Sequence, residues 1–267
     1  TGTQGAASLP GYYNSSRVLT ILVKDRPDTF HSESIAQGLK IYRNGEAVTV
    51  SPDHITWSHN GDLHTGTYTF SQDGEYSWNL TYTNKAGNSP VDIVAPTDCD
   101  IYAFTLDTEN PYGLSISYEP GFVDTILEGI TFGFYRAPVN VVITATDDTA
   151  GLESFTYSYT PDGSGNGLNT GMEKVLIPFQ ELDQDGNRAS ARFTVPPQFR
   201  GKVSFTATDK AGHSATLTDD ARVLVVDTIA PGITVEYDDT AAVNESYYSA
   251  PRTATIRIEE SNFFHED

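Results

Sequence analysis

The sequence predicts an all-β fold built from tandem β-sandwiches, and three observations support this prediction. Glycine, proline, asparagine, aspartate and serine recur about every ten residues, and β-branched and aromatic residues fill the intervals, a pattern typical of many short strands. Helical periodicity is almost absent. One motif occurs three times along the chain, and a second motif occurs twice between its copies, as expected for a string of similar modules.

The motif that occurs three times, here called the opening motif, predicts a strand with one buried face. Its copies read YYNSSRVLTILVKD (12–25), FYRAPVNVVITATDD (134–148) and YYSAPRTATIRIEE (247–260). Alternate residues of a strand lie on the same face of the sheet, and only one parity is apolar in all three copies. We therefore expect these residues to face the core: Leu19, Ile21 and Val23; Val141, Ile143 and Ala145; Ala254, Ile256 and Ile258.

The second motif, here called the closing motif, predicts a strand followed by a tight turn. It reads DGEYSWNLTYTNKAGN (73–88) and RGKVSFTATDKAGH (200–213). Its glycine suits a turn residue with positive φ. The copies lead into VDIVAP (91–96) and VVDTIAP (225–231), where proline keeps the preceding residue extended and favours stiff joints over flexible linkers.

These repeats divide the chain into three predicted parts: a sandwich over residues 8–96, a second sandwich over 97–226, and the start of a third over 227–267. The second module carries two predicted insertions, at 107–133 and 160–172. The first could be an added hairpin that covers a sheet edge, or an exposed recognition surface. The second is a glycine-rich tip.

Charge and composition exclude several classes of partner. The net charge is −20, which argues against nucleic acid and anionic membranes. Residues 1–96 hold nine acidic and six basic side chains, whereas residues 97–267 hold 27 and ten. Cys99 is the single cysteine, so no intramolecular disulfide can form. Because no run of about 18 apolar residues occurs, no membrane insertion is expected.

The closing motif also carries a resemblance to a known family. TNKAGN and TDKAGH, with the DTIAP that follows the second, resemble the bacterial Ig-like repeats of Gram-positive cell-surface proteins. DGEY (73–76) resembles the tyrosine corner of immunoglobulin-type sandwiches; Val203 replaces this tyrosine in the second module. The resemblance implies tandem immunoglobulin-like β-sandwiches in an extracellular protein of the cell surface or cell wall.

The function implied by this resemblance is that of a non-catalytic segment, a rigid spacer or adhesive stalk. Its expected partners are neighbouring Ig-like modules of the same polypeptide and a host or cell-wall ligand. The sequence contains no phosphate-binding glycine loop, zinc-type cysteine pair or nucleophile elbow, so we expect no enzyme and assign no catalytic residue. One alternative is an accessory region of a surface hydrolase. Another is a carbohydrate- or protein-binding module with the insertions of the second module as its site, which exposed aromatic residues in 112–132 would favour.

Cation binding is the one ligand chemistry that the acidic sequence suggests. Asp183, Asp185 and Asn187 are spaced like the first oxygen ligands of a calcium loop. The same residues also fit an ordinary hairpin turn with Gly186 at positive φ. A second candidate is the joint after the second module, where Asp227 precedes Asp238 and Asp239 in sequence; these aspartates could equally cap turns. No other cofactor is expected.

Overall fold

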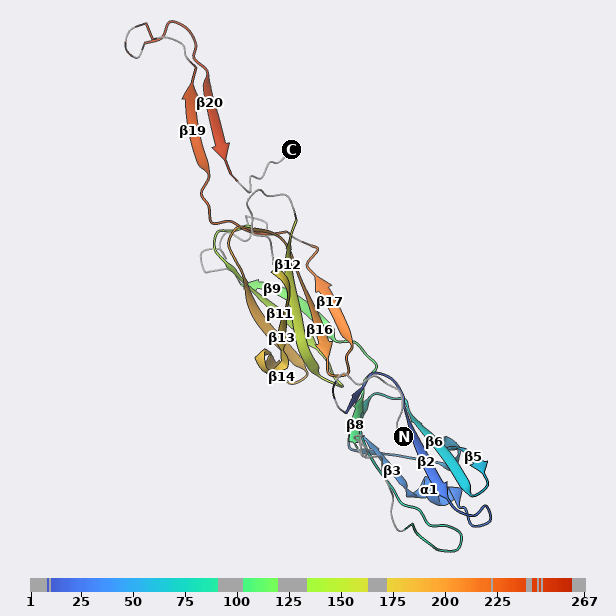
Figure 1. Cartoon of the computed structure of the whole chain (residues 1–267). Helices are drawn as coiled ribbons and strands as arrows, with labels where there is room; N and C mark the ends of the chain where they lie inside the picture. The colour runs from blue at the N-terminus through green and yellow to red at the C-terminus, as the bar shows by residue number, and fades with distance from the viewer. Residues whose placement is uncertain are drawn as a thin grey trace.

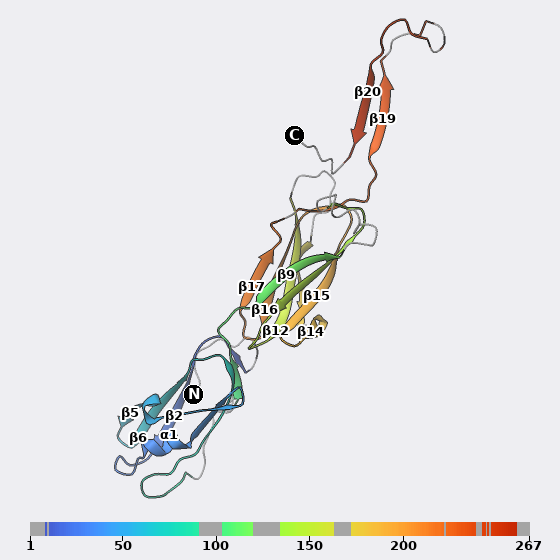
Figure 2. The ribbon, with the colours of Figure 1, turned by 180° about the vertical axis from the view of Figure 1, so that it is seen from behind.

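The computed structural model describes residues 9, 11–90, 103–119, 134–162, 172–221, 223–238, 242, 243, 245 and 247–260. Two β-sandwiches follow one another end to end, and a two-stranded ribbon extends from the second (Figure 1). The same arrangement is seen from behind in Figure 2. The all-β sandwich prediction is confirmed.

Module 1 is a sandwich of a five-stranded and a three-stranded sheet, with strand orders β1-β8-β7-β3-β4 and β2-β6-β5. The strands are β1 (Tyr12–Tyr13), β2 (Arg17–Lys24), β3 (Leu39–Arg43), β4 (Glu46–Val48), β5 (Thr56–Asn60), β6 (Leu63–Phe70), β7 (Gly74–Leu80) and β8 (Ala103–Leu106). The helix α1 (Ser32–Gly38) and the 3-10 turn η1 (Pro52–His54) complete it. The short helix α1 is not apparent from the sequence pattern. It buries Ile35 and Ala36 in the module core.

Module 2 pairs a sheet of order β10-β18-β16-β12-β13, with β17 also on β16, against a sheet of order β14-β15-β11-β9. The strands are β9 (Tyr112–Glu119), β10 (Phe134–Tyr135), β11 (Val139–Thr146), β12 (Leu152–Pro161), β13 (Met172–Pro178), β14 (Asp183–Asp185), β15 (Arg188–Val195), β16 (Phe199–Asp209), β17 (Ser214–Thr218) and β18 (Leu224–Val226). The 3-10 turn η2 (Phe179–Glu181) lies between β13 and β14.

The predicted core parity holds in both sandwiches. Ile143 is fully buried in module 2, and the other two residues of its parity are buried with it. Ile21 is buried in module 1, where its two neighbours of the same parity pack partly against the core. The hydroxyl of Tyr76 donates a hydrogen bond of 2.7 Å to the Gln72 carbonyl, which is the upstream backbone contact that defines a tyrosine corner.

The boundary between the two sandwiches lies later than residue 96. Strand β8 pairs with β7 and, in parallel, with β1, so residues 103–106 complete the sheet of module 1. The predicted division at 96 was based on the motif VDIVAP (91–96), and this motif lies outside the described residues. The chain passes from the first sandwich to the second between Leu106 and Tyr112.

This shift also corrects the first predicted insertion. Its described part, 107–119, consists of the connection between the modules and β9, which is an edge strand of module 2 paired with β11. Residues 120–133 lie outside the described residues, as does the tip of the second predicted insertion, 163–171. The β12–β13 hairpin flanks that tip.

The strands after module 2 form a two-stranded ribbon, β19 (Gly232–Tyr237) paired with β20 (Ala254–Glu259). The third opening motif therefore forms a strand, as predicted. Its core-parity residues are exposed, because no second sheet covers them among the described residues: Ile256 is 64% and Ile258 51% exposed. Among the described residues, no helix has the length and apolar character needed to cross a membrane.

Candidate functional site

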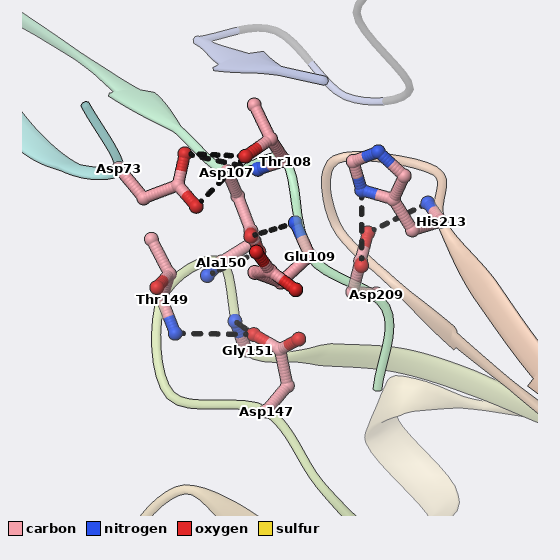
Figure 3. A network of polar contacts seen from close by, with 10 residues as sticks. All are labelled: Asp73, Asp107, Thr108, Glu109, Asp147, Thr149, Ala150, Gly151, Asp209 and His213. Atoms are coloured by element: carbon pink, nitrogen blue, oxygen red, sulfur yellow. Dashed lines mark hydrogen bonds and ion pairs between the residues drawn. The ribbon is translucent and has the colours of Figure 1, made fainter. Parts of the chain in front are cut away.

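Three buried aspartates meet where module 1 joins module 2 (Figure 3). Asp107 directly follows β8, Asp147 directly follows β11, and Asp209 is the last residue of β16. One carboxylate oxygen from each side chain lies within 4.8 Å of the other two. Their side chains are 0–3% exposed, so three acidic groups share one water-poor space.

Backbone N–H groups of the adjoining turns hold these carboxylates in place. Asp107 Oδ1 accepts a hydrogen bond of 3.1 Å from the backbone amide of Glu109. Asp147 Oδ1 accepts one of 2.6 Å from Gly151, whose φ of 74° favours glycine. Asp209 Oδ1 accepts one of 3.0 Å from the His213 amide across the closing-motif turn. Each turn therefore fixes the direction of its own carboxylate.

The aspartate that follows β8 also connects the two modules. Asp107 Oδ2 accepts a 3.0 Å hydrogen bond from the Ala150 amide of module 2. The next residue, Thr108, donates from its amide and hydroxyl to Asp73 of module 1, at 3.0–3.1 Å. The ammonium group of Lys210 lies 5.6 Å from the ring centroid of Tyr12 in module 1. The connection is therefore a structured joint.

Burial and mutual repulsion disfavour the charged form of this cluster. The pKa of Asp209 rises to about 6, chiefly through desolvation and also through the nearby charges of Asp147 and Asp107. Desolvation likewise raises the pKa of Asp107. Asp209 Oδ2 and His213 Nδ1 are both buried without a hydrogen-bond partner, 3.5 Å apart. The site thus concentrates negative charge and leaves one carboxylate oxygen unsatisfied.

The joint follows a motif that the sequence contains twice. Asp107 begins DTENP (107–111), and Asp227 begins DTIAP (227–231). The amide of Asp107 donates to the Tyr13 carbonyl at 2.9 Å, and that of Asp227 to the Tyr135 carbonyl at 2.8 Å. In both copies of the motif, the backbone amide of its third residue donates a hydrogen bond to Oδ1 of the aspartate. The equivalent of DTIAP in module 1 is therefore DTENP, and not VDIVAP.

The cation residues predicted from the sequence lie elsewhere. Asp183 and Asp185 belong to the exposed edge strand β14, which turns through Gly186 at φ 60° into β15. Asn187 donates a hydrogen bond from its side chain to Asp148. Among the described residues, the structure groups three acidic ligand atoms at the joint and not at this hairpin. A cation at this hairpin stays an untested prediction.

The second predicted arrangement, Asp227 with Asp238, does not come together at one site. The six-residue strand β19 separates the two residues. Asp238 lies at the far end of the ribbon, where its Oδ2 accepts a 2.7 Å hydrogen bond from the Thr253 amide. Asp239 lies outside the described residues.

Comparison with known proteins adds little to this description. No protein-family model matches the chain, and no curated protein matches it. A crystal structure of BcpA, the major pilin subunit of Bacillus cereus, matches with 12% sequence identity over 90% of this chain and 82% of that one, at a TM-score of 0.23. A likeness at this TM-score carries no weight for fold or function.

Proposed function

We propose that the chain is a non-catalytic segment of a bacterial cell-surface protein in which tandem Ig-like sandwiches act as a rigid spacer or stalk. The observation that carries this proposal is the built joint. Its linking residues are hydrogen-bonded to both modules, through Asp73 on one side and Ala150 on the other. A flexible linker between independent domains has few contacts across the boundary, whereas a spacer needs a fixed angle.

The repeated motifs support the same function. The last strand, the DT-x-x-P joint and the opening motif recur in the same order, so that each module ends in the connection to the next. Neighbouring modules of the same polypeptide are then the partners. The Gram-positive resemblance of TNKAGN and TDKAGH favours a location on the cell surface or in the cell wall.

The alternative, a carbohydrate- or protein-binding region of a surface hydrolase, depends on aromatic residues in 112–132. Two of these are described. Tyr118 packs partly against the module 2 core and hydrogen-bonds Asp219. Tyr112 is 51% exposed, but its hydroxyl donates to Asp148. The described part of this segment therefore favours a structural role.

Residual dipolar couplings test the rigid joint in the whole chain. If the joint is rigid, one alignment tensor fits the amides of both modules. A variant with four glycines inserted after Asn110 should need two tensors of different magnitude, because the modules then reorient independently. Two tensors for the unmodified chain, under all conditions tested, would contradict the spacer function.

A further inference from the structure

The cluster at the joint has more negative charge than its surroundings balance. Among the described residues, His213 is the one ion-pair partner of any of the three carboxylates, and its Nδ1 lies 3.5 Å from Asp209. Lys210 directly follows Asp209 in the sequence, but its ammonium group lies near the rings of Tyr12 and Phe179. Buried charges in proteins are paired or coordinate metals, because desolvation is otherwise too costly.

A second observation, an oxygen without a hydrogen bond, points to a ligand at this cluster. Asp209 Oδ2 is fully buried and accepts no hydrogen bond, although almost every buried polar atom has a partner. Its other oxygen is engaged by the backbone amide of the turn. This oxygen, which lies 3.5 Å from His213 Nδ1 (Figure 3), belongs to the same carboxyl group that contributes an atom to the cluster with Asp107 and Asp147.

The equivalent positions of module 1 show what the same fold does without a cluster of carboxylates. In the opening motif Asp25 takes the place of Asp147, and in the closing motif Asn84 takes the place of Asp209. Asp25 accepts hydrogen bonds from the hydroxyls of Thr29 and Tyr82. This lone carboxylate is satisfied by neutral donors, whereas the three at the joint are held close together by backbone amides.

We propose that Asp107, Asp147 and Asp209 bind one divalent cation, calcium, at the joint between the two modules. Carboxylate oxygens are the ligands of hard cations, and calcium accepts six to eight oxygens in a flexible geometry. Backbone amides orient each carboxylate, as supporting hydrogen bonds do around metal ligands. Because one ligand follows module 1 and two belong to module 2, the ion bridges the modules. Its role as a stiffener rests on the proposed spacer function, whereas its binding does not.

The pattern of acidic residues recurs at the following joint. Asp227 occupies the position of Asp107, and Glu260, at the end of the third opening motif, occupies the position of Asp147. All three ligand positions are acidic at the first joint, and both positions that can be matched at the second are acidic too.

Isothermal titration of the chelator-treated full chain with calcium chloride, at neutral pH and constant ionic strength, tests the site. We expect a single site that titrates below about 1 mM, within the range of extracellular calcium modules. Asp209→Asn keeps the turn acceptor that Asn84 provides in module 1, so it should fold, and it should weaken binding at least about 10-fold. The control Asp183→Asn/Asp185→Asn should bind as the parent does.

Two further arms distinguish the ions. Magnesium, which demands octahedral geometry, should bind more weakly than calcium. His213→Asn, which copies Asn88 of module 1, should leave calcium binding unchanged. Loss of calcium binding in His213→Asn, or tighter binding of zinc than of calcium by the parent chain, would assign a mixed nitrogen–oxygen site and overturn the calcium proposal. Absence of binding up to 5 mM calcium, or binding that Asp209→Asn retains and the hairpin variant loses, would also overturn it. Rigid modules without calcium binding would leave the spacer function standing.

Discussion

Asp107 of the first sandwich and Ala150 of the second are joined by a 3.0 Å hydrogen bond from the alanine amide to the aspartate carboxylate. The contact is buried, and Asp107 belongs to the connection that leaves module 1. A segment that links two domains is thus also a structural part of both. The proposed spacer function depends on this joint, because the same buried contact holds the two modules together and orients a carboxylate of the acidic cluster.

Calcium should stabilise the folded chain through the site at the joint, beyond the general effect of salt. A ligand at about 100 times its dissociation constant adds about 2.7 kcal/mol to the free energy of unfolding, so the melting temperature should rise by several degrees. Sodium chloride at equal ionic strength should reproduce only the general screening of a −20 protein. Differential scanning calorimetry distinguishes the two effects; equal shifts with both salts, or a full calcium shift in Asp209→Asn, would contradict specific binding.

Equivalent isoleucines of the second and third opening motifs should respond differently to truncation. Ile143 is fully buried in module 2, so Ile143→Ala should cost about 2–5 kcal/mol. Ile256 occupies the same motif position but is 64% exposed on the ribbon, so Ile256→Ala should change the urea midpoint of the sandwiches little. Similar costs for both variants would mean that the ribbon is packed like a complete module.

Acid should destabilise module 1 partly through Asp25. The hydrogen bond from Thr29, followed by that from Tyr82, lowers the pKa of Asp25 in the folded state. Because the folded pKa lies below the unfolded one, this contribution is present above the unfolded value of about 3.9 and is lost as pH falls through the folded pKa. Thr29→Ala should therefore lose less stability than the parent between about pH 5 and 2.

A double-variant comparison isolates this effect. In an Asp25→Asn background, Thr29→Ala should no longer alter the pH dependence of the urea midpoint. A change of equal size in both backgrounds would mean that the threonine acts through packing and not through the carboxylate.

The ribbon should be the first part of the chain to be cut by protease. Strands β19 and β20 pair only with each other among the described residues, and their apolar side chains are more than half exposed. An isolated two-stranded ribbon is at best marginally stable. Limited proteolysis followed by mass spectrometry should show early cleavage within 232–260, with the sandwiches intact. Full protection of this segment in a verified monomer would instead place it in module 2.

Local patterns predicted much of the fold. The period-2 alternation around Ile21 and Ile143 identified the buried face, and DGEY identified the Tyr76 corner, because both features depend on residues close in sequence. Helix α1 was missed because seven residues with two buried side chains leave too short a periodic signal. The end of module 1 was missed because VDIVAP resembled the later joint more obviously than DTENP did.

The acidic cluster could not be found by a search for local ligand spacing. Asp107, Asp147 and Asp209 come from three strand ends, and only the topology of β8, β11 and β16 brings them together. The sequence-based search instead favoured Asp183 and Asp185, which are close in sequence but lie along an exposed edge strand. A comparison of DTENP with DTIAP, and of the residues twelve positions after Tyr13, Tyr135 and Tyr248, would have indicated Asp107 and Asp147 as joint residues.

The most direct test of the account is the distribution of distances between spin labels in the two modules, measured with calcium and after its removal by chelator. The labels are placed at the exposed positions Asn79 and Lys174, in a Cys99→Ser background. We predict one narrow distribution in calcium, which broadens on chelation and in Asp209→Asn. An equally broad distribution in all three samples would contradict a joint that fixes the angle between the modules.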